Sequence, residues 1–99
     1  MDFQIESNVV FKHAAGQVSA DLGGEMAILD SKSGIYYGLD SVGARIWGLI
    51  QEGKTLSGIR DCLLEEYEVN PEQLETDICA LIEQLQAKGL IEKDTVPNS

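Results

Sequence analysis

The sequence predicts an α+β domain in which a three-stranded antiparallel sheet is followed by three helices. Two observations lead to this prediction. Up to residue 39, apolar residues alternate with polar ones or form short β-branched and aromatic runs, which is typical of strands. From residue 41 onward, apolar residues recur at helical spacing in three stretches that glycines and capping residues separate.

The first predicted strand covers residues 17–22, where polar and apolar residues alternate cleanly. Such alternation places all apolar side chains on one face, as in a half-buried strand. The turn that follows is predicted at Gly23 and Gly24. The expected inward residues are Val18, Ala20 and Leu22, and the expected outward residues are Gln17, Ser19 and Asp21.

The second predicted strand, residues 25–30, alternates less strictly than the first. Ala27 and Leu29 are apolar, and so are Met26 and Ile28, which face the other way. A strand that is apolar on both faces is expected in the middle of a sheet with cover on both sides. We therefore predict an antiparallel meander with this strand at its centre.

A tight turn through residues 31–34 leads to the third strand, whose sequence is rich in aromatic and β-branched residues. Adjacent residues of a strand face opposite ways, so Tyr37 is expected to face the helices together with Ile35 and Leu39, and Tyr36 to face outward. The chain then enters a helix, which leaves this strand without a later hairpin partner. Its edge is expected to be open and able to accept a peptide.

The first two helices are predicted at about residues 41–52 and 56–67. Asp40 or Ser41 opens the first and Gly53 ends it, whereas Thr55 is the expected N-cap of the second. Trp47 is expected at the border of the first apolar stripe. The two stripes are Val42, Ile46, Leu49 and Ile50, and Leu56, Ile59, Leu63 and Tyr67.

The third helix has the strongest boundary signals in the chain. Asn70 is the expected N-cap, Pro71 occupies the first helical position, Gln73 occupies the capping-box position, and Gly89 ends the helix. Its apolar stripe consists of Leu74, Ile78, Leu81, Ile82 and Leu85.

The segments outside these elements are expected to be short. The apolar run at residues 9–11 could pack across the sheet, and Leu90 with Ile91 indicates a short extended segment. The expected organisation is an N-terminal arm at residues 1–16, a single domain at residues 17–92 and a flexible tail at residues 93–99. A length of 99 residues supports one modest core.

The charge balance excludes several classes of partner. Seven Lys and Arg residues against 17 Asp and Glu give a formal net charge of −10, which disfavours binding to nucleic acid or to an anionic membrane. No apolar stretch approaches the roughly 20 residues of a membrane span, and the first residues lack a basic signal-peptide start. Cys62 and Cys79 fall within helical patterns, so we expect reduced thiols in a cytoplasmic protein.

Catalytic chemistry has little support in the sequence. His13 is the single histidine, so neither a metal site nor a nucleophile–base pair is predicted, and we expect this side chain to be solvated. The glycines form no phosphate-binding motif, and no cofactor is expected. The acidic residues of the second and third helices are interpreted as solvated faces: Glu65, Glu66, Glu68, Glu72, Glu75, Asp77 and Glu83.

A hairpin combined with three helices is similar to a winged helix-turn-helix, which makes a small acidic regulator one possible function. A recognition helix normally carries Arg or Lys, however, and the third helix has mainly acidic residues with Lys88 alone as a cation. The same architecture offers a groove between the third strand and the third helix. An extended peptide could add to the sheet there, without any catalytic residue.

Several segments together resemble the PqqD-like family, the recognition elements for ribosomally made and post-translationally modified peptides. They are GEMAILDSKSGIYYGLDSVGARIW at residues 24–47, Gly53-Lys54-Thr55, LLEEYEV at residues 63–69 and LQAKGLIE at residues 85–92. The segment around YYGLD and VGARIW is most similar to the stand-alone leader-binding proteins of lasso peptide systems. The family pattern often has Asn where this chain has Asp40, and either residue can cap a helix.

The resemblance implies a non-catalytic protein that binds the leader region of a precursor peptide. It implies that a separate cysteine leader peptidase is a further partner, and it leaves a cyclase open as another. The leader would pair along the third strand and pack against the third helix. The implied contacts are Gly34, Ile35, Tyr36, Tyr37, Gly38 and Leu39, with Leu74, Asp77, Ile78 and Leu81. Recognition in another pathway, such as quinone cofactor synthesis or radical-enzyme crosslinking, stays an alternative.

Overall fold

The computed structural model describes residues 9–94, and it confirms an α+β fold in which a three-stranded antiparallel sheet precedes three helices. The predictions for the first eight residues and for the last five lie outside the described residues. The elements are β1 (Phe11–His13), β2 (Gln17–Asp21), β3 (Met26–Asp30), β4 (Ile35–Leu39), α1 (Ser41–Gln51), α2 (Leu56–Glu66), α3 (Pro71–Ala87) and β5 (Ile91–Lys93).

The main sheet has the strand order β2-β3-β4, so the predicted meander with a central second strand is confirmed. Both pairs are antiparallel, and Ile28 of β3 lies between Ser19 of β2 and Tyr37 of β4. The predicted tight turn joins β3 to β4. In it the Gly34 amide donates to the Asp30 carbonyl at 2.7 Å, and Gly34 has a φ of +74°, which glycine adopts without strain.

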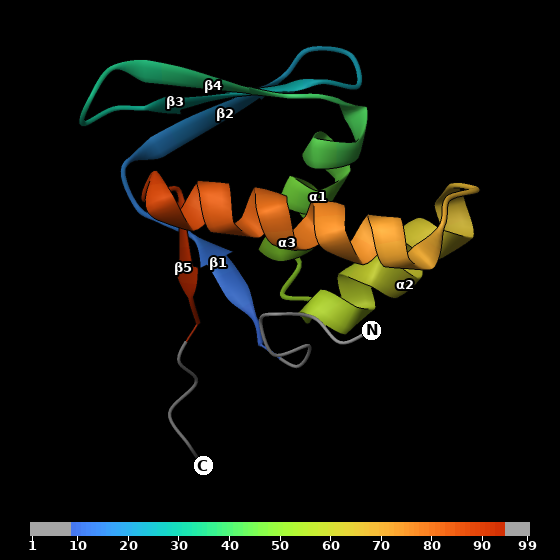
Figure 1. Ribbon diagram of the computed structural model, residues 1–99. Helices are drawn as coiled ribbons and strands as arrows, with labels where there is room; N and C mark the ends of the chain where they lie inside the picture. The colour runs from blue at the N-terminus through green and yellow to red at the C-terminus, as the bar shows by residue number, and fades with distance from the viewer. Residues whose placement is uncertain (1–8, 95–99) are drawn as a thin grey trace.

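All three helices lie on one side of the main sheet (Figure 1). Ile28 and Leu39 face them and are buried, and Tyr37 on the same face packs against the core. The opposite face is open, with Val18 62% and Tyr36 69% exposed. Two predictions were therefore wrong: Val18 and its neighbours in β2 are not half-buried, and β3 is not covered on both faces.

The beginning and end of the described chain form a second sheet that the sequence did not predict. β1 pairs with β5 in antiparallel register, with Lys12 opposite Glu92. Phe11 is buried in the core from this sheet and does not pack across the main one. The extended segment predicted at Leu90 and Ile91 is confirmed by β5, whereas the domain boundaries at residues 16 and 92 stay predictions.

The predicted helix starts are confirmed by their hydrogen bonds. The side chains of Asp40, Thr55 and Asn70 accept from backbone amides in the first turns of α1, α2 and α3. Gly89 follows α3 with a φ of +73°. The capping-box role of Gln73 was wrong, because its side-chain amide donates to Asp77 Oδ1 at 2.9 Å, one turn further along the helix.

A single core fills the space between the main sheet, the helices and the second sheet. Trp47 is 2% exposed and belongs to the centre of this core, not to the border of the α1 stripe as predicted. The cysteines are free thiols, with Cys79 buried and Cys62 half-buried. The aliphatic residues that α1, α2 and α3 bury in this core are Ile46, Leu49, Ile50, Leu56, Ile59, Leu63, Leu74, Ile78, Ile82 and Leu85.

Glu75 of α3 departs from the solvated faces expected for the acidic residues. Glu75 is 9% exposed, and its carboxylate accepts from Arg60 Nη1 at 2.7 Å. This hydrogen bond raises the pKa of the Arg60 guanidinium. The cause is tertiary packing. Because α3 packs on α2, the carboxylate of Glu75 lies against the guanidinium of Arg60 instead of water.

His13 is half-buried and was wrongly expected to be solvated. Its ring stacks on Trp47 with the ring centroids 3.6 Å apart and an angle of 17° between the planes. Its Nε2 lies 3.0 Å from the carbonyl oxygen of Trp47, which can only accept a hydrogen bond. Burial lowers the pKa of the imidazole below 6.5, and the hydrogen bond opposes this effect.

The lowered pKa of His13 makes the stability of the fold pH-dependent. Unfolding frees the imidazole to bind a proton that the folded state resists, so this contribution is complete above pH 6.5 and declines as the pH falls through the folded pKa. We expect thermal unfolding followed by circular dichroism to give a lower midpoint at about pH 5 than at about pH 8.

A matched variant isolates this effect. In His13→Gln the amide can still donate to the Trp47 carbonyl but does not titrate, so its midpoint should change less over the same range. Glu66 does not compete with this effect, because Arg45 lowers the pKa of its carboxylate below 4.5 and so shifts its transition further into acid. Equal pH dependence in both proteins would contradict the assignment to His13.

Candidate peptide-binding site

The free edge of β4 is the first component of the candidate site. β4 pairs with β3 along one side, and in the part of the chain that the structure describes no strand pairs with its other side. An edge strand presents unpaired backbone N–H and C=O groups, which can hydrogen-bond to an added strand. The open edge predicted from the sequence is therefore present.

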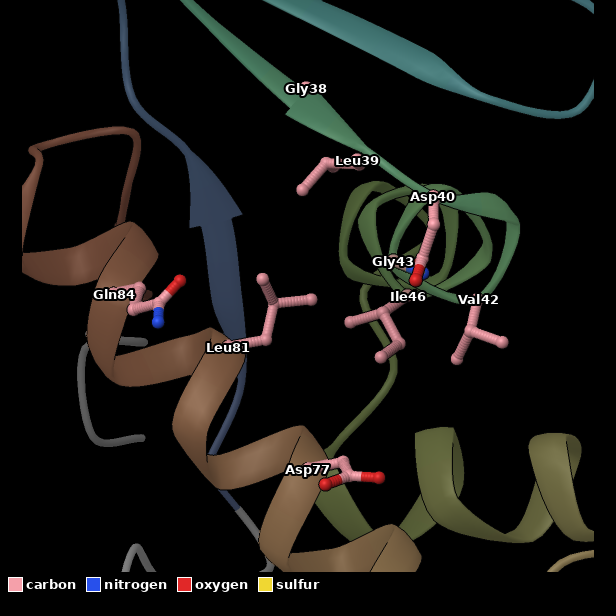
Figure 2. Close-up of a pocket in the computed structure, with 9 residues that line it drawn as sticks. All are labelled: Gly38, Leu39, Asp40, Val42, Gly43, Ile46, Asp77, Leu81 and Gln84. Atoms are coloured by element: carbon pink, nitrogen blue, oxygen red, sulfur yellow. The ribbon is translucent and has the colours of Figure 1, made fainter.

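The second component is a hollow of about 390 Å³ at the C-terminal end of β4. It lies between the end of β4, the first turns of α1 and one face of α3 (Figure 2). Its lining residues are Gly38, Leu39, Asp40, Val42, Gly43, Ile46, Asp77, Leu81 and Gln84.

The lining of this hollow combines apolar side chains with two carboxylates. Leu81 of α3 and Ile46 of α1 point toward each other across the hollow (Figure 2). Asp40 and Asp77 each use Oδ1 in the local structure, for the Gly43 amide at 2.8 Å and for the Gln73 side chain at 2.9 Å. The arrangement suits an apolar side chain of a peptide whose neighbouring groups are neutral or basic.

Gly43 allows β4 and α1 to approach each other closely at this point. A Cβ atom at Gly43 would lie 3.3 Å from Asp40 Oδ1 and 3.3 Å from Leu39 Cβ, which is tighter than ordinary contact. The absence of a side chain therefore lets the capped helix begin directly beneath the end of the strand. The hollow owes its α1 wall to this close approach.

The structure brings together four of the residues that the sequence assigned to the site: Gly38, Leu39, Asp77 and Leu81. It also supplies lining residues that sequence reasoning missed, from α1 and from Gln84 one turn beyond Leu81. The available signal was the N-cap at Asp40, which places the first turn of α1 next to the end of β4. Their part in peptide binding stays a prediction.

The remaining predicted residues lie away from the hollow. Leu74 is 5% exposed and Ile78 is fully buried, so both belong to the core. Gly34, Ile35 and Tyr36 lie at the other end of β4. Ile35 shares the face of Tyr37 and Leu39, as predicted, but it is 50% exposed. The β4 hairpin extends past the helices there (Figure 1), which leaves Ile35 without cover.

Tyr37 occupies the middle of β4 between these two ends. Its ring is half-buried against the core, and Lys88 Nζ lies 5.0 Å from the ring centroid. A cation over an aromatic face is a favourable contact, and here it links β4 to the residue that caps the C-terminal end of α3. This contact joins the middle of β4 to the C-terminal end of α3.

Neither a metal site nor a membrane-spanning helix is found among residues 9–94. In this part of the chain no three His, Cys, Asp or Glu side chains are grouped so that they could hold a metal ion. None of its helices combines the length and the apolar character needed to cross a membrane.

Comparison with known proteins gives one family match and two similar solved structures. The model of the family described as coenzyme PQQ synthesis protein D (PqqD) matches residues 25–91. No curated protein matches the chain.

Both solved structures contain a leader peptide. TbiB1 in complex with the TbiA(beta) leader peptide is 34% identical, with a TM-score of 0.76, over 88% of this chain and 99% of that chain. Lasso peptide synthetase B1 complexed with its leader peptide is 29% identical, also with a TM-score of 0.76, over 83% of this chain and 96% of that chain.

Substitutions at two nearby positions of α3 should distinguish a core residue from a residue that lines the hollow. Ile78→Ala removes a fully buried side chain, and we expect it to lower the free energy of unfolding by about 2–5 kcal/mol. Leu81→Ala removes a half-exposed side chain that lines the hollow, so its cost should be clearly smaller. Urea unfolding of both variants measures the difference, and equal losses would show that Leu81 is a core residue.

Proposed function

This chain belongs to the PqqD family, and we propose that it is a non-catalytic protein that binds the leader region of a ribosomally made precursor peptide. The observation that carries the proposal is the open edge of β4 beside the hollow between β4, α1 and α3. The leader complexes of the two similar proteins support it.

The physical basis is the addition of a peptide strand to the main sheet. Backbone pairing along β4 supplies affinity that depends little on sequence, whereas alternate side chains of the added strand enter pockets and provide specificity. The hollow takes one apolar side chain between Leu81 and Ile46. Asp40 and Asp77, together with a net charge of −10, favour a leader that is neutral or basic near this position.

We further propose that the precursor is a lasso peptide and that the protein acts in the cytoplasm. There it would present the leader to a separate cysteine leader peptidase, and a cyclase would act afterwards. The similarity to a lasso peptide synthetase B1 supports this pathway. Holding a flexible substrate next to the peptidase raises its effective concentration without any catalytic group in this chain. The proposed role of the protein is therefore to recruit the precursor peptide to the peptidase.

Quinone cofactor synthesis is the second candidate, because the matching family model is described by that pathway. The two similar leader complexes give more support to a lasso precursor, since one of them is a lasso peptide synthetase. Titrating the protein against leaders of both kinds of precursor distinguishes the pathways. Tight binding to a quinone-type precursor alone would favour the second candidate.

The proposal is tested by a fluorescence-anisotropy titration of a labelled synthetic leader from the precursor encoded beside this chain. We expect saturable binding with a Kd below about 10 μM, which corresponds to about 7 kcal/mol. Leu81→Asp places a charge in the apolar part of the hollow and should weaken binding by about tenfold or more.

The matched control is Ala80→Asp, which adds the same charge one residue earlier on the exposed face of α3. It should bind the leader like the unmodified protein, and circular dichroism should show both variants folded. A scrambled leader that binds equally well would contradict leader recognition. Unchanged binding by Leu81→Asp would show that the leader lies elsewhere on the domain.

A further inference from the structure

The face of the main sheet that points away from the helices is an uncharged surface. In the register of the sheet, Val18 lies opposite Leu29 and Leu29 opposite Tyr36, and the next row of the same face has two alanines and a glycine. We name these six residues the outer sheet face: Val18, Ala20, Ala27, Leu29, Tyr36 and Gly38. The helices lie on the other side of the sheet (Figure 1).

This surface is open despite its apolar character. Val18 is 62% and Tyr36 69% exposed, and Leu22, which follows β2 directly, is 62% exposed. Exposed apolar patches of this kind mark interaction sites, and the centres of protein interfaces are poor in charged residues and rich in tyrosine. In a chain with 17 acidic residues, six neighbouring sheet positions without any charge stand out.

The outer sheet face is continuous with the candidate leader site, because both include β4. A leader strand added at the free edge of β4 would extend the sheet, and every second leader side chain would lie on this same face beside Tyr36. A protein that covers the face would therefore contact β4 and the bound leader together. No other face of the sheet gives a partner access to both.

The charges at the rim indicate the chemistry of this partner. Glu25 and Asp40 are exposed at the end of the sheet where β3 begins and β4 ends, and Lys32 is exposed in the β3–β4 turn at the other end. A second copy of this chain would bring the same acidic rim and another net charge of −10, which opposes its approach. A partner with an apolar centre and a basic rim fits this surface better.

We propose that the outer sheet face is the docking surface for the leader peptidase. This inference rests on the proposed function, since it assigns a surface to a partner that the proposal already requires. Docking there leaves the hollow between β4, α1 and α3 free for the leader. It also places the peptidase over β4, next to the segment that it must cleave from the precursor.

The test introduces a charge on the outer sheet face at a position remote from the leader. Val18 lies on β2, on the far side of β3 from β4. We expect Val18→Lys to weaken binding of the purified peptidase encoded beside this chain by about tenfold or more in biolayer interferometry, with leader present. Leader binding by Val18→Lys, measured by anisotropy, should stay unchanged.

The matched control is Ser19→Lys, which adds the same charge to the exposed next residue of β2, whose side chain belongs to the opposite face. It should bind the peptidase like the unmodified protein. Leu22→Lys is a second variant of the apolar surface and should repeat the loss. Circular dichroism establishes that each variant is folded.

Each outcome has a separate meaning. Peptidase binding that survives both Val18→Lys and Leu22→Lys would overturn the docking surface while leaving leader recognition intact. A dimer in sedimentation velocity that Val18→Lys dissociates would assign the face to a second copy and also overturn the inference. If the unmodified protein binds the peptidase but no leader, leader recognition is contradicted, whereas the assignment of the docking surface is not.

Discussion

The structure depends on the immediate passage from β4 into α1. Asp40 follows the last residue of β4 and caps the helix by accepting from the Gly43 amide at 2.8 Å. Because the chain leaves the sheet at this point, β4 has no following strand and its edge stays open. Gly43 then permits the close packing that forms one wall of the hollow. One capped junction thus creates both components of the candidate site.

The second consequence of this junction is that the domain has a one-sided sheet. The helices that follow pack on the same face of the main sheet and bury Ile28 and Leu39 against their apolar stripes (Figure 1). Only one core is possible in a chain of this size, so the other face of the sheet has nothing in the described chain to cover it. One face of the main sheet therefore packs in the core and stabilises the domain, whereas the other face is available for interactions.

The two arginines of the chain form ion pairs between neighbouring helices. Arg45 pairs with Glu66 at 2.7 Å and links α1 to α2, and Arg60 pairs with Glu75 at 2.7 Å and links α2 to α3. The Arg45 pair is exposed, and such pairs contribute little to stability, so their effect is mainly to orient the helices. The net charge of −10 gives the surface a negative field that attracts basic peptides and repels nucleic acid.

The sequence by itself determined the order of the three main-sheet strands and the three helices, the N-caps and the open edge of β4, because alternation, N-cap residues and glycines act over a few neighbouring residues. It also identified four lining residues of the hollow. Only the tertiary structure decided which stripe residues are accessible: Ile78 and Leu81 share the apolar stripe of α3, yet one is buried and the other lines the hollow. It likewise decided that Val18 is exposed and that His13 stacks on Trp47. Periodicity tells which side chains share a face, but the cover of that face comes from elements distant in the chain.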